Sequence, residues 1–304
     1  MKNLHLQHPE DCVLWGDLSI LNWFVTPGHL SVKIDGCPAI VWGTNPANGQ
    51  FFVGTKSVFN KVKIKINHNH EEIDLHHEGE VAEILHRAFD SLPRTDSIFQ
   101  GDVIGLGNSD QYTPNTITYL FSEKIDALIV APHTEYVAEN DLRNAVASTL
   151  TRKLQSNEYT LFVQPNAYIF GEQNAFYDVN EICDFARQMA MLVQFPKTQK
   201  EIRIIQKALN DCIRNQTEVN ENEIAELTNC DVNLIRLWKL VKSIKDDCLY
   251  LCRNNGPAAF IGLDRIDAEG YVLSNEYGTH KLVNREFFSY ANFTMGKMNR
   301  MCAG

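Results

Sequence analysis

The stretch Val32-Lys33-Ile34-Asp35-Gly36 decides the fold, because it places a lysine and a carboxylate two residues apart inside an apolar, β-prone run. Residues two apart on a strand share one face, so Lys33 and Asp35 are predicted to point into the same cleft. Gly36 permits a sharp turn into the apolar run 38–42. The sequence predicts a strand-turn-strand unit with the polar pair at its bend. Taken alone, the pattern also fits a surface hairpin carrying an ion pair.

The composition is that of an ordinary globular protein. The chain has 304 residues, 44% hydrophobic and 22% charged, which is enough for one large or two medium-sized domains. No apolar run reaches the length of a membrane span, and residues 1–8 lack the apolar core of a secretory signal. We therefore expect no membrane partner and a cytoplasmic location. The eight cysteines include no Cys-x-x-Cys pair, so free thiols are expected.

The net charge of −10 argues against a protein that binds nucleic acid through a broad basic surface. Local contacts remain open. Residues 60–66 alternate lysine with apolar residues, which predicts a strand with one basic face. That face is either solvated or in contact with a phosphate backbone.

Most of the chain has the pattern of a mixed α+β domain. The aromatic segment 1–30 is expected to pack on the core, and the turn 45–49 predicts a hairpin. The histidine-rich stretch 68–78 fits an exposed polar loop better than a metal site, because its spacing has no recognisable ligand frame. Periodicity predicts helices over 78–92 and 139–155, and strands over 97–105, 115–121, 125–136 and 158–170.

Residues 181–252 have helical periodicity throughout and fit three or four helices. Within them, 222–238 resembles a helix-turn-helix, although the local charge is not basic. After Gly256-Pro257 the β pattern resumes, with a turn at 275–278. We interpret 181–252 as an inserted subdomain that serves as a lid, as a module that positions RNA, or as a surface for a homodimer or protein partner.

Five further segments follow the opening stretch in a fixed order along the chain. Together with it they resemble the successive motifs of the covalent nucleotidyltransferases, which are the ATP-dependent DNA and RNA ligases and the mRNA capping enzymes. The segment that begins at Ile98 corresponds to the third motif and runs on through Gly105-Leu106-Gly107 toward Tyr119. It is most similar to the third motif of phage-type RNA ligases. It is the order of the set that makes the resemblance specific. The segments are Phe52-Val53-Gly54-Thr55-Lys56-Ser57, Ile98-Phe99-Gln100-Gly101-Asp102-Val103, Thr116-Ile117-Thr118-Tyr119-Leu120-Phe121, Ala268-Glu269-Gly270-Tyr271-Val272-Leu273 and His280-Lys281-Leu282-Val283-Asn284.

The resemblance implies an α+β fold of the nucleotidyltransferase (ATP-grasp-like) type, with packed antiparallel sheets. The nucleotidyltransferase domain would comprise 1–180 and 253–304, interrupted by the helical insertion 181–252. The roughly twenty residues after Lys281 are too few for the C-terminal OB domain of DNA ligases and capping enzymes.

The resemblance also implies a site. Lys33 would attack the α-phosphorus of ATP and form a lysyl-AMP intermediate, provided that its pocket lowers its pKa. Asp102 and Glu269 would lie near ribose and hold Mg²⁺ or Mn²⁺, which prefer oxygen ligands. Lys281 would contact the α-phosphate, and Tyr119 would stack on adenine. The remaining nucleotide-binding residues would be Val32, Asp35 and Lys56.

The implied activity is an ATP-dependent RNA ligase that joins 5′-phosphate to 3′-hydroxyl ends. A DNA ligase is one alternative. Val283 stands where these ligases often have a second lysine, which Arg285 or Lys56 would have to replace, and Asp102 stands for the usual glutamate. These departures and the acidic balance raise a second alternative, a non-ligating nucleotide-binding protein that holds a partner through 181–252.

Overall fold

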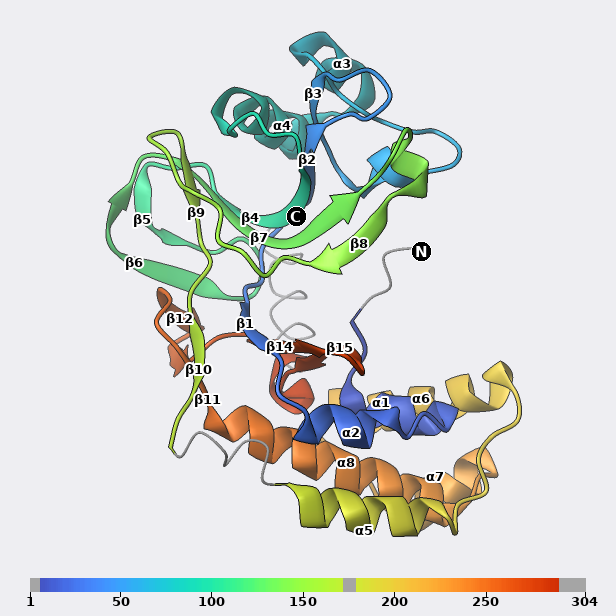
Figure 1. The fold of residues 1–304 in the computed structure, drawn as a ribbon. Helices are drawn as coiled ribbons and strands as arrows, with labels where there is room; N and C mark the ends of the chain where they lie inside the picture. The colour runs from blue at the N-terminus through green and yellow to red at the C-terminus, as the bar shows by residue number, and fades with distance from the viewer. Residues whose placement is uncertain (1–5, 172–178, 290–304) are drawn as a thin grey trace. The chain divides into compact units, whose positions relative to one another are not determined.

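The computed structural model describes residues 6–171 and 179–289 and shows a mixed α+β chain with several antiparallel sheets (Figure 1). The chain forms two compact units. The sheet unit contains 34–165 and 256–266. The helical unit contains, among the described residues, 6–33, 166–171, 179–255 and 267–289.

The sheet unit is built on two antiparallel sheets. One has the strand order β3-β2-β4-β7-β8, with β9 parallel to β7, and the other has the order β13-β12-β6-β5. Its strands are β2 Ala39–Thr44, β3 Phe51–Gly54, β4 Ile98–Gly105, β5 Ser109–Tyr112, β6 Thr118–Ile125, β7 Leu128–Val137, β8 Val146–Thr149, β9 Thr160–Phe162, β12 Ala258–Ile261 and β13 Asp264–Ile266. Its helices are η2 Lys56–Phe59, α3 His70–His76, α4 Gly79–Ser91 and η3 Leu142–Asn144.

The hairpin between β2 and β3 confirms the predicted turn at 45–49. The Asn45 side chain accepts a hydrogen bond from the Ala47 N–H at 3.0 Å, and Gly49 adopts a φ of +71°, which favours glycine. The predicted apolar stripe of α4 is also confirmed, because Leu85 and Ala88 are fully buried against the sheet core around Trp42.

The helical unit surrounds one large core. Helix α8 contributes most to it, α1, α5 and α7 pack against α8, and α2 packs against α5 (Figure 1). The helices are α1 Pro9–Cys12, η1 Val13–Trp15, α2 Ser19–Val25, α5 Asn180–Ala190, α6 Gln199–Arg214, α7 Glu221–Thr228 and α8 Val232–Leu251. The strands are β1 His29–Lys33, β10 Ala167–Ile169, β11 Cys252–Asn254, β14 Gly270–Asn275 and β15 Gly278–Leu282, arranged as a β1-β14-β15 sheet and a β10-β11 pair.

The four helices from α5 to α8 confirm the helical character of 181–252, but they do not form a separate subdomain. Their apolar faces are buried with residues 6–33 and with the β1-β14-β15 sheet in one core. The helix-turn-helix interpretation fits poorly, because α8 buries eight side chains, Trp238 among them, and lies inside that core. The expected division into 1–180 with 253–304 and an inserted 181–252 therefore differs from the two units of the structure.

Two local predictions were wrong. Residues 60–66 form no strand, and Val62 is 78% exposed, because the chain leaves β3 through η2 and Lys63 adopts a left-handed φ of +56°. The predicted helix 139–155 does not form. This region contains η3 and β8, and β8 pairs with Thr134–Val137 of β7. In this second case, pairing along an existing strand prevails over helix propensity.

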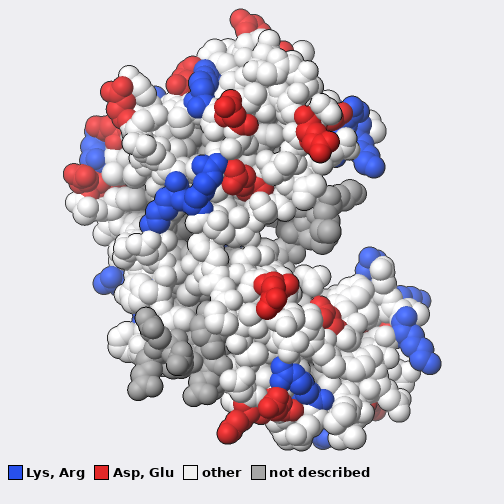
Figure 2. All heavy atoms as spheres, in the orientation of Figure 1, with Lys and Arg blue, Asp and Glu red and all other residues white. Residues whose placement is uncertain are grey.

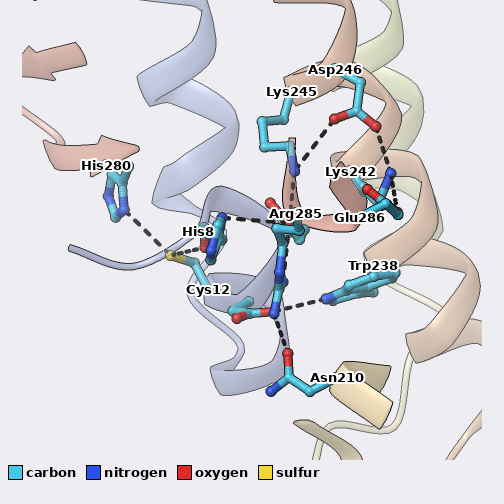
Figure 3. A network of polar contacts seen from close by, with 12 residues as sticks. His8, Cys12, Asn210, Trp238, Lys242, Lys245, Asp246, His280, Arg285 and Glu286 are labelled. Atoms are coloured by element: carbon cyan, nitrogen blue, oxygen red, sulfur yellow. Dashed lines mark hydrogen bonds and ion pairs between the residues drawn. The ribbon is translucent and has the colours of Figure 1, made fainter. Parts of the chain in front are cut away.

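A buried charge network ties the beginning of the helical unit to α6, α8 and the segment after β15 (Figure 3). Lys245 and Arg285 donate to the Glu10 carboxylate at 2.9 and 3.1 Å, and all three side chains are almost inaccessible to solvent. Arg285 also donates to Asp11 at 2.8 Å and to Asn210 at 2.6 Å. Burial alone would raise the pKa of Glu10, but the Lys245 and Arg285 cations lower it to about 2.

Replacement of Glu10 should destabilise the protein strongly. Glu10→Gln leaves two buried cations without their carboxylate, and such a loss costs about 3–5 kcal/mol. Asp211→Asn, which removes a surface ion pair of Arg214 on α6, should cost less than about 1 kcal/mol. Urea denaturation at neutral pH measures both values. Equal stabilities of the two variants would contradict the role assigned to Glu10.

Because of the Glu10 carboxylate, we expect the free energy of unfolding to decrease at acidic pH. Its pKa is lower in the folded than in the unfolded state, so its contribution is complete above about pH 4.5 and is lost as the pH falls toward about 2. Denaturation at several pH values should show a shallower decline in this window for Glu10→Gln than for the wild type. Parallel declines would show that other groups carry the acid sensitivity.

Candidate active site

The β1-β14-β15 sheet has two different faces. Directly paired residues of antiparallel strands point to the same side, and the side alternates along each strand. Val32, Tyr271 and Leu282 are mutually paired and contact the core of the helical unit. Lys33, Ser31 and Lys281 therefore lie on the opposite face, away from that core.

Strand pairing places the predicted nucleophile beside a carboxylate. Lys33 is the last residue of β1 and pairs with Gly270, the first residue of β14, so it lies next to Glu269, which directly precedes that strand. The Lys33 Nζ donates to the Glu269 carboxylate, and the two side chains are 26% and 16% exposed. Two residues more than 230 positions apart in the sequence thus form a half-buried ion pair at one edge of the sheet.

Lys281 supplies a second cation on the same face. It pairs with Val272 of β14, and its backbone N–H donates to the Gln7 carbonyl at 3.3 Å. Burial lowers the pKa of Lys281, and the nearby Lys33 cation lowers it further, whereas Glu269 opposes both effects. A lysine held in this way favours a bound anion, because a phosphate would stabilise its charged form.

Gly270 allows the strands to approach closely beside Glu269. A Cβ atom at this position would lie 2.2 Å from the Leu282 carbonyl oxygen and 2.7 Å from a methyl group of Val283. The glycine after Glu269 is therefore a packing requirement that keeps β14 against β15. Val283 itself is buried, at 5% exposure.

The other predicted residues lie in the sheet unit. Strand β1 ends at Lys33, so the expected shared strand face of Lys33 and Asp35 does not form, and β1 and β2 belong to different sheets. The Asp35 N–H donates to the Tyr119 hydroxyl at 2.8 Å, and Asn115 donates to the Asp35 carboxylate at 2.9 Å. Tyr119 is 1% exposed. Its stacking on adenine, which the resemblance implies, stays a prediction.

The loop after Asp35 packs tightly on β4. A Cβ on Gly36 would lie 2.6 Å from the Val103 carbonyl oxygen and 2.9 Å from Cβ of Asp102. The Asp102 side chain is 20% exposed, and its carboxylate lies 3.6 Å from Nε2 of His133, a neighbour that none of the motifs contains. The sequence gives no signal for His133, because only the pairing of β4 with β7 brings it near.

The remaining predicted residues have simpler surroundings. Lys56 is exposed at the start of η2, and Val32 contacts the core of the helical unit. Arg285 cannot replace the missing lysine at position 283, because the residue is 6% exposed and its guanidinium is bound to Glu10 and Asp11. That part of the expectation is corrected.

A metal ion would have to use these carboxylates singly. Within 6–171 and 179–289, no group of three or more His, Cys, Asp or Glu side chains is arranged to hold a metal ion. Asp102 and Glu269 nevertheless present partly exposed oxygens, which are the donors that Mg²⁺ accepts together with phosphate oxygens and water. Each carboxylate, taken by itself, is therefore a donor of the kind that Mg²⁺ uses.

The family of unknown function DUF6267 matches residues 3–229 and 197–297. The chain belongs to this family. No curated protein and no solved structure matches the chain significantly.

Within the described part of this DUF6267 protein, no helix has the length and apolarity needed to cross a bilayer. The surface in view carries cationic and anionic side chains in small separate groups (Figure 2).

Gly270→Ala tests the strand packing that holds the Lys33–Glu269 pair. The added methyl group overlaps the Leu282 carbonyl, so β15 must shift and the free energy of unfolding should fall by about 1–3 kcal/mol. Glu276→Ala, in the exposed turn of the same hairpin, should change it by less than about 0.5 kcal/mol. Chemical denaturation compares the two variants, and an unaffected Gly270→Ala protein would disprove the close approach.

Proposed function

We propose that the protein is an ATP-dependent polynucleotide ligase of the covalent nucleotidyltransferase type, with RNA as the preferred substrate. The observation that carries this proposal is that one sheet brings together Lys33 at the end of β1, Glu269 just before β14 and Lys281 in β15. These residues come from three separate motifs of the ordered set. A chance resemblance would not require them to meet.

Lys33 has the surroundings of a nucleophile that must be deprotonated before attack. Its Nζ contacts the Glu269 carboxylate, which lies within reach to accept a proton or to orient the amine. In the proposed step, the Nζ lone pair forms a bond to the α-phosphorus of ATP. The bond from that phosphorus to the pyrophosphate oxygen breaks, and pyrophosphate leaves with the electron pair. The product is lysyl-AMP.

Lys281 fits the role of a phosphate-binding cation. Two lysines face one carboxylate on this side of the sheet, so the local charge favours an anion. Mg²⁺, held through Asp102 or Glu269, would supply neutralisation of phosphate charge. In later steps the adenylate would pass to a 5′-phosphate end, and a 3′-hydroxyl would displace it.

A non-ligating nucleotide-binding protein is the second candidate. It is favoured by the contact of the Lys33 Nζ with the Glu269 carboxylate, which engages the side chain in an ion pair, and by Val283 at the position of the usual second lysine. Both candidates predict ATP binding. Only the ligase predicts release of pyrophosphate and a covalent product.

Lys33 should become labelled when the protein is incubated with Mg²⁺ and ATP that is radioactive at the α-phosphate. Lys33→Ala and Lys33→Arg should abolish the label, because neither supplies a free primary amine at that site. Lys200→Ala, an exposed lysine in the first turn of α6, should keep it. Label that persists in Lys33→Ala would overturn the assignment, and ATP binding without pyrophosphate release would favour the non-ligating protein.

The substrate is tested by comparing ends under identical conditions. Single-stranded or nicked RNA with a 5′-phosphate should be joined at least about tenfold faster than nicked duplex DNA, and Lys281→Ala should slow joining by at least about tenfold through loss of one phosphate contact. Gel electrophoresis of end-labelled strands measures both rates. Efficient sealing of nicked DNA with no joining of RNA would make the protein a DNA ligase.

A further inference from the structure

The β10-β11 pair in the helical unit has a buried face and an aromatic face. Ala167 and Ile169 contact the core of the unit. Tyr168 and Phe170 alternate with them, and they are 50% and 63% exposed. The ladder continues past β10, because the Phe170 N–H donates to the Leu251 carbonyl at 2.8 Å. Large aromatic side chains on the solvent side of such a short strand pair have no role in its core.

Arg253 lies between the aromatic rings of this face. It pairs directly with Tyr168 across the ladder, so both side chains point to the same side. The guanidinium carbon lies 5.5 Å from the centroid of Phe170 and 5.8 Å from that of Tyr250, the penultimate residue of α8. Tyr250 is 75% exposed. We call Tyr168, Phe170, Tyr250 and Arg253 the aromatic platform.

The guanidinium of the aromatic platform is held in place. Its Nη1 donates to the carbonyls of Tyr250 and Cys252, both at 2.7 Å. Its Nε lies 3.8 Å from the Asp267 carboxylate, which is 63% exposed and therefore compensates the charge weakly. A fixed cation beside three exposed rings presents flat π surfaces together with a donor for phosphate, at little further entropic cost.

We propose that the aromatic platform binds single-stranded nucleic acid through base stacking. Stacking on exposed rings is the means by which proteins bind unpaired bases without sequence preference, and arginine adds a cation–π contact. The choice of RNA over DNA as the natural strand rests on the proposed ligase function. The inference that the platform binds a single strand does not depend on that function. Because one cation serves three rings, stacking contributes more to this binding than phosphate neutralisation.

The test uses the full chain and a fluorescein-labelled single-stranded oligoadenylate, with binding measured by fluorescence anisotropy. Phe170→Ala and Tyr250→Ala should each weaken binding by at least about fivefold, which corresponds to the loss of one stacked base. Tyr250→Phe, which keeps the ring, should bind like the wild type. Phe185→Ala is the matched control, since this α5 side chain is 55% exposed and lies outside the platform.

Two further arms separate the alternatives. Double-stranded RNA should compete poorly, because its bases are already stacked on one another, and the dependence of binding on salt should be shallow. Labelling of Lys33 by ATP is measured on the same variants and should be unchanged. Loss of binding in the platform variants of a protein that never labels Lys33 would support the platform and reject the ligase.

The proposal is overturned if Phe170→Ala and Tyr250→Ala bind the oligonucleotide as tightly as the wild type, or if the wild type does not bind it. It is also overturned if these substitutions change only the oligomeric state measured by sedimentation. In that outcome the aromatic platform is a contact surface for protein.

Discussion

The antiparallel pairing of β1 with β14 is the interaction on which the candidate site depends. It joins residues 29–33 to residues 270–274, and β15 extends the same sheet with residues from 278 onward. Backbone hydrogen bonding fixes the register, and a slip of one residue would move Lys33 to the face that is buried against the helices. The core face of this sheet, through Tyr271, Leu273 and Leu282, anchors that register.

Charge is used in two different ways within the helical unit. In the buried network, Glu10 is matched by Lys245 and Arg285 inside the core, so these groups are committed to structure. On the outer face of the β1-β14-β15 sheet, Lys33 and Lys281 face one carboxylate and are partly accessible. Burial of the first set costs desolvation that its partners offset, whereas the second set keeps an electrostatic preference for an anion. The contrast explains why Arg285 is excluded from phosphate binding although it lies only four residues after Lys281.

The sequence predicts the parts of the fold that local pattern determines. The apolar stripe of α4, the four helices after residue 180, and the hairpins around Asn45 and Asn275 all follow from periodicity and turn residues. The predictions failed where tertiary pairing decides. Val146–Thr149 pair with β7 instead of forming a helix. Residues 60–66 alternate lysine with apolar residues but form no strand, because no partner strand of the described chain lies beside them. Residues 6–33 belong to the same unit as residues 166–171 and 179–255, which lie far from them in the sequence, and no local pattern reveals this.

For the site, the ordered motifs named Lys33, Glu269 and Lys281 as site residues, and only the strand pairing of the structure shows that they lie at one sheet. The roles of Asp35, Asp102 and Tyr119 stay predictions. The buried network had a detectable signal. Lys245 occupies a helical position between Val241 and Cys248 on the apolar side of α8, where a charged residue requires a partner. Its partner Glu10 could be identified only from the folded chain.

The most direct test of the central claim is mass spectrometry of the intact protein and of its peptides after incubation with ATP and Mg²⁺. The account predicts a mass increase of one adenylate, located on the peptide that contains Lys33 and lost in acid, as expected of a phosphoramidate bond. An adenylate attached to another residue, or no mass increase when ATP binds, would contradict it.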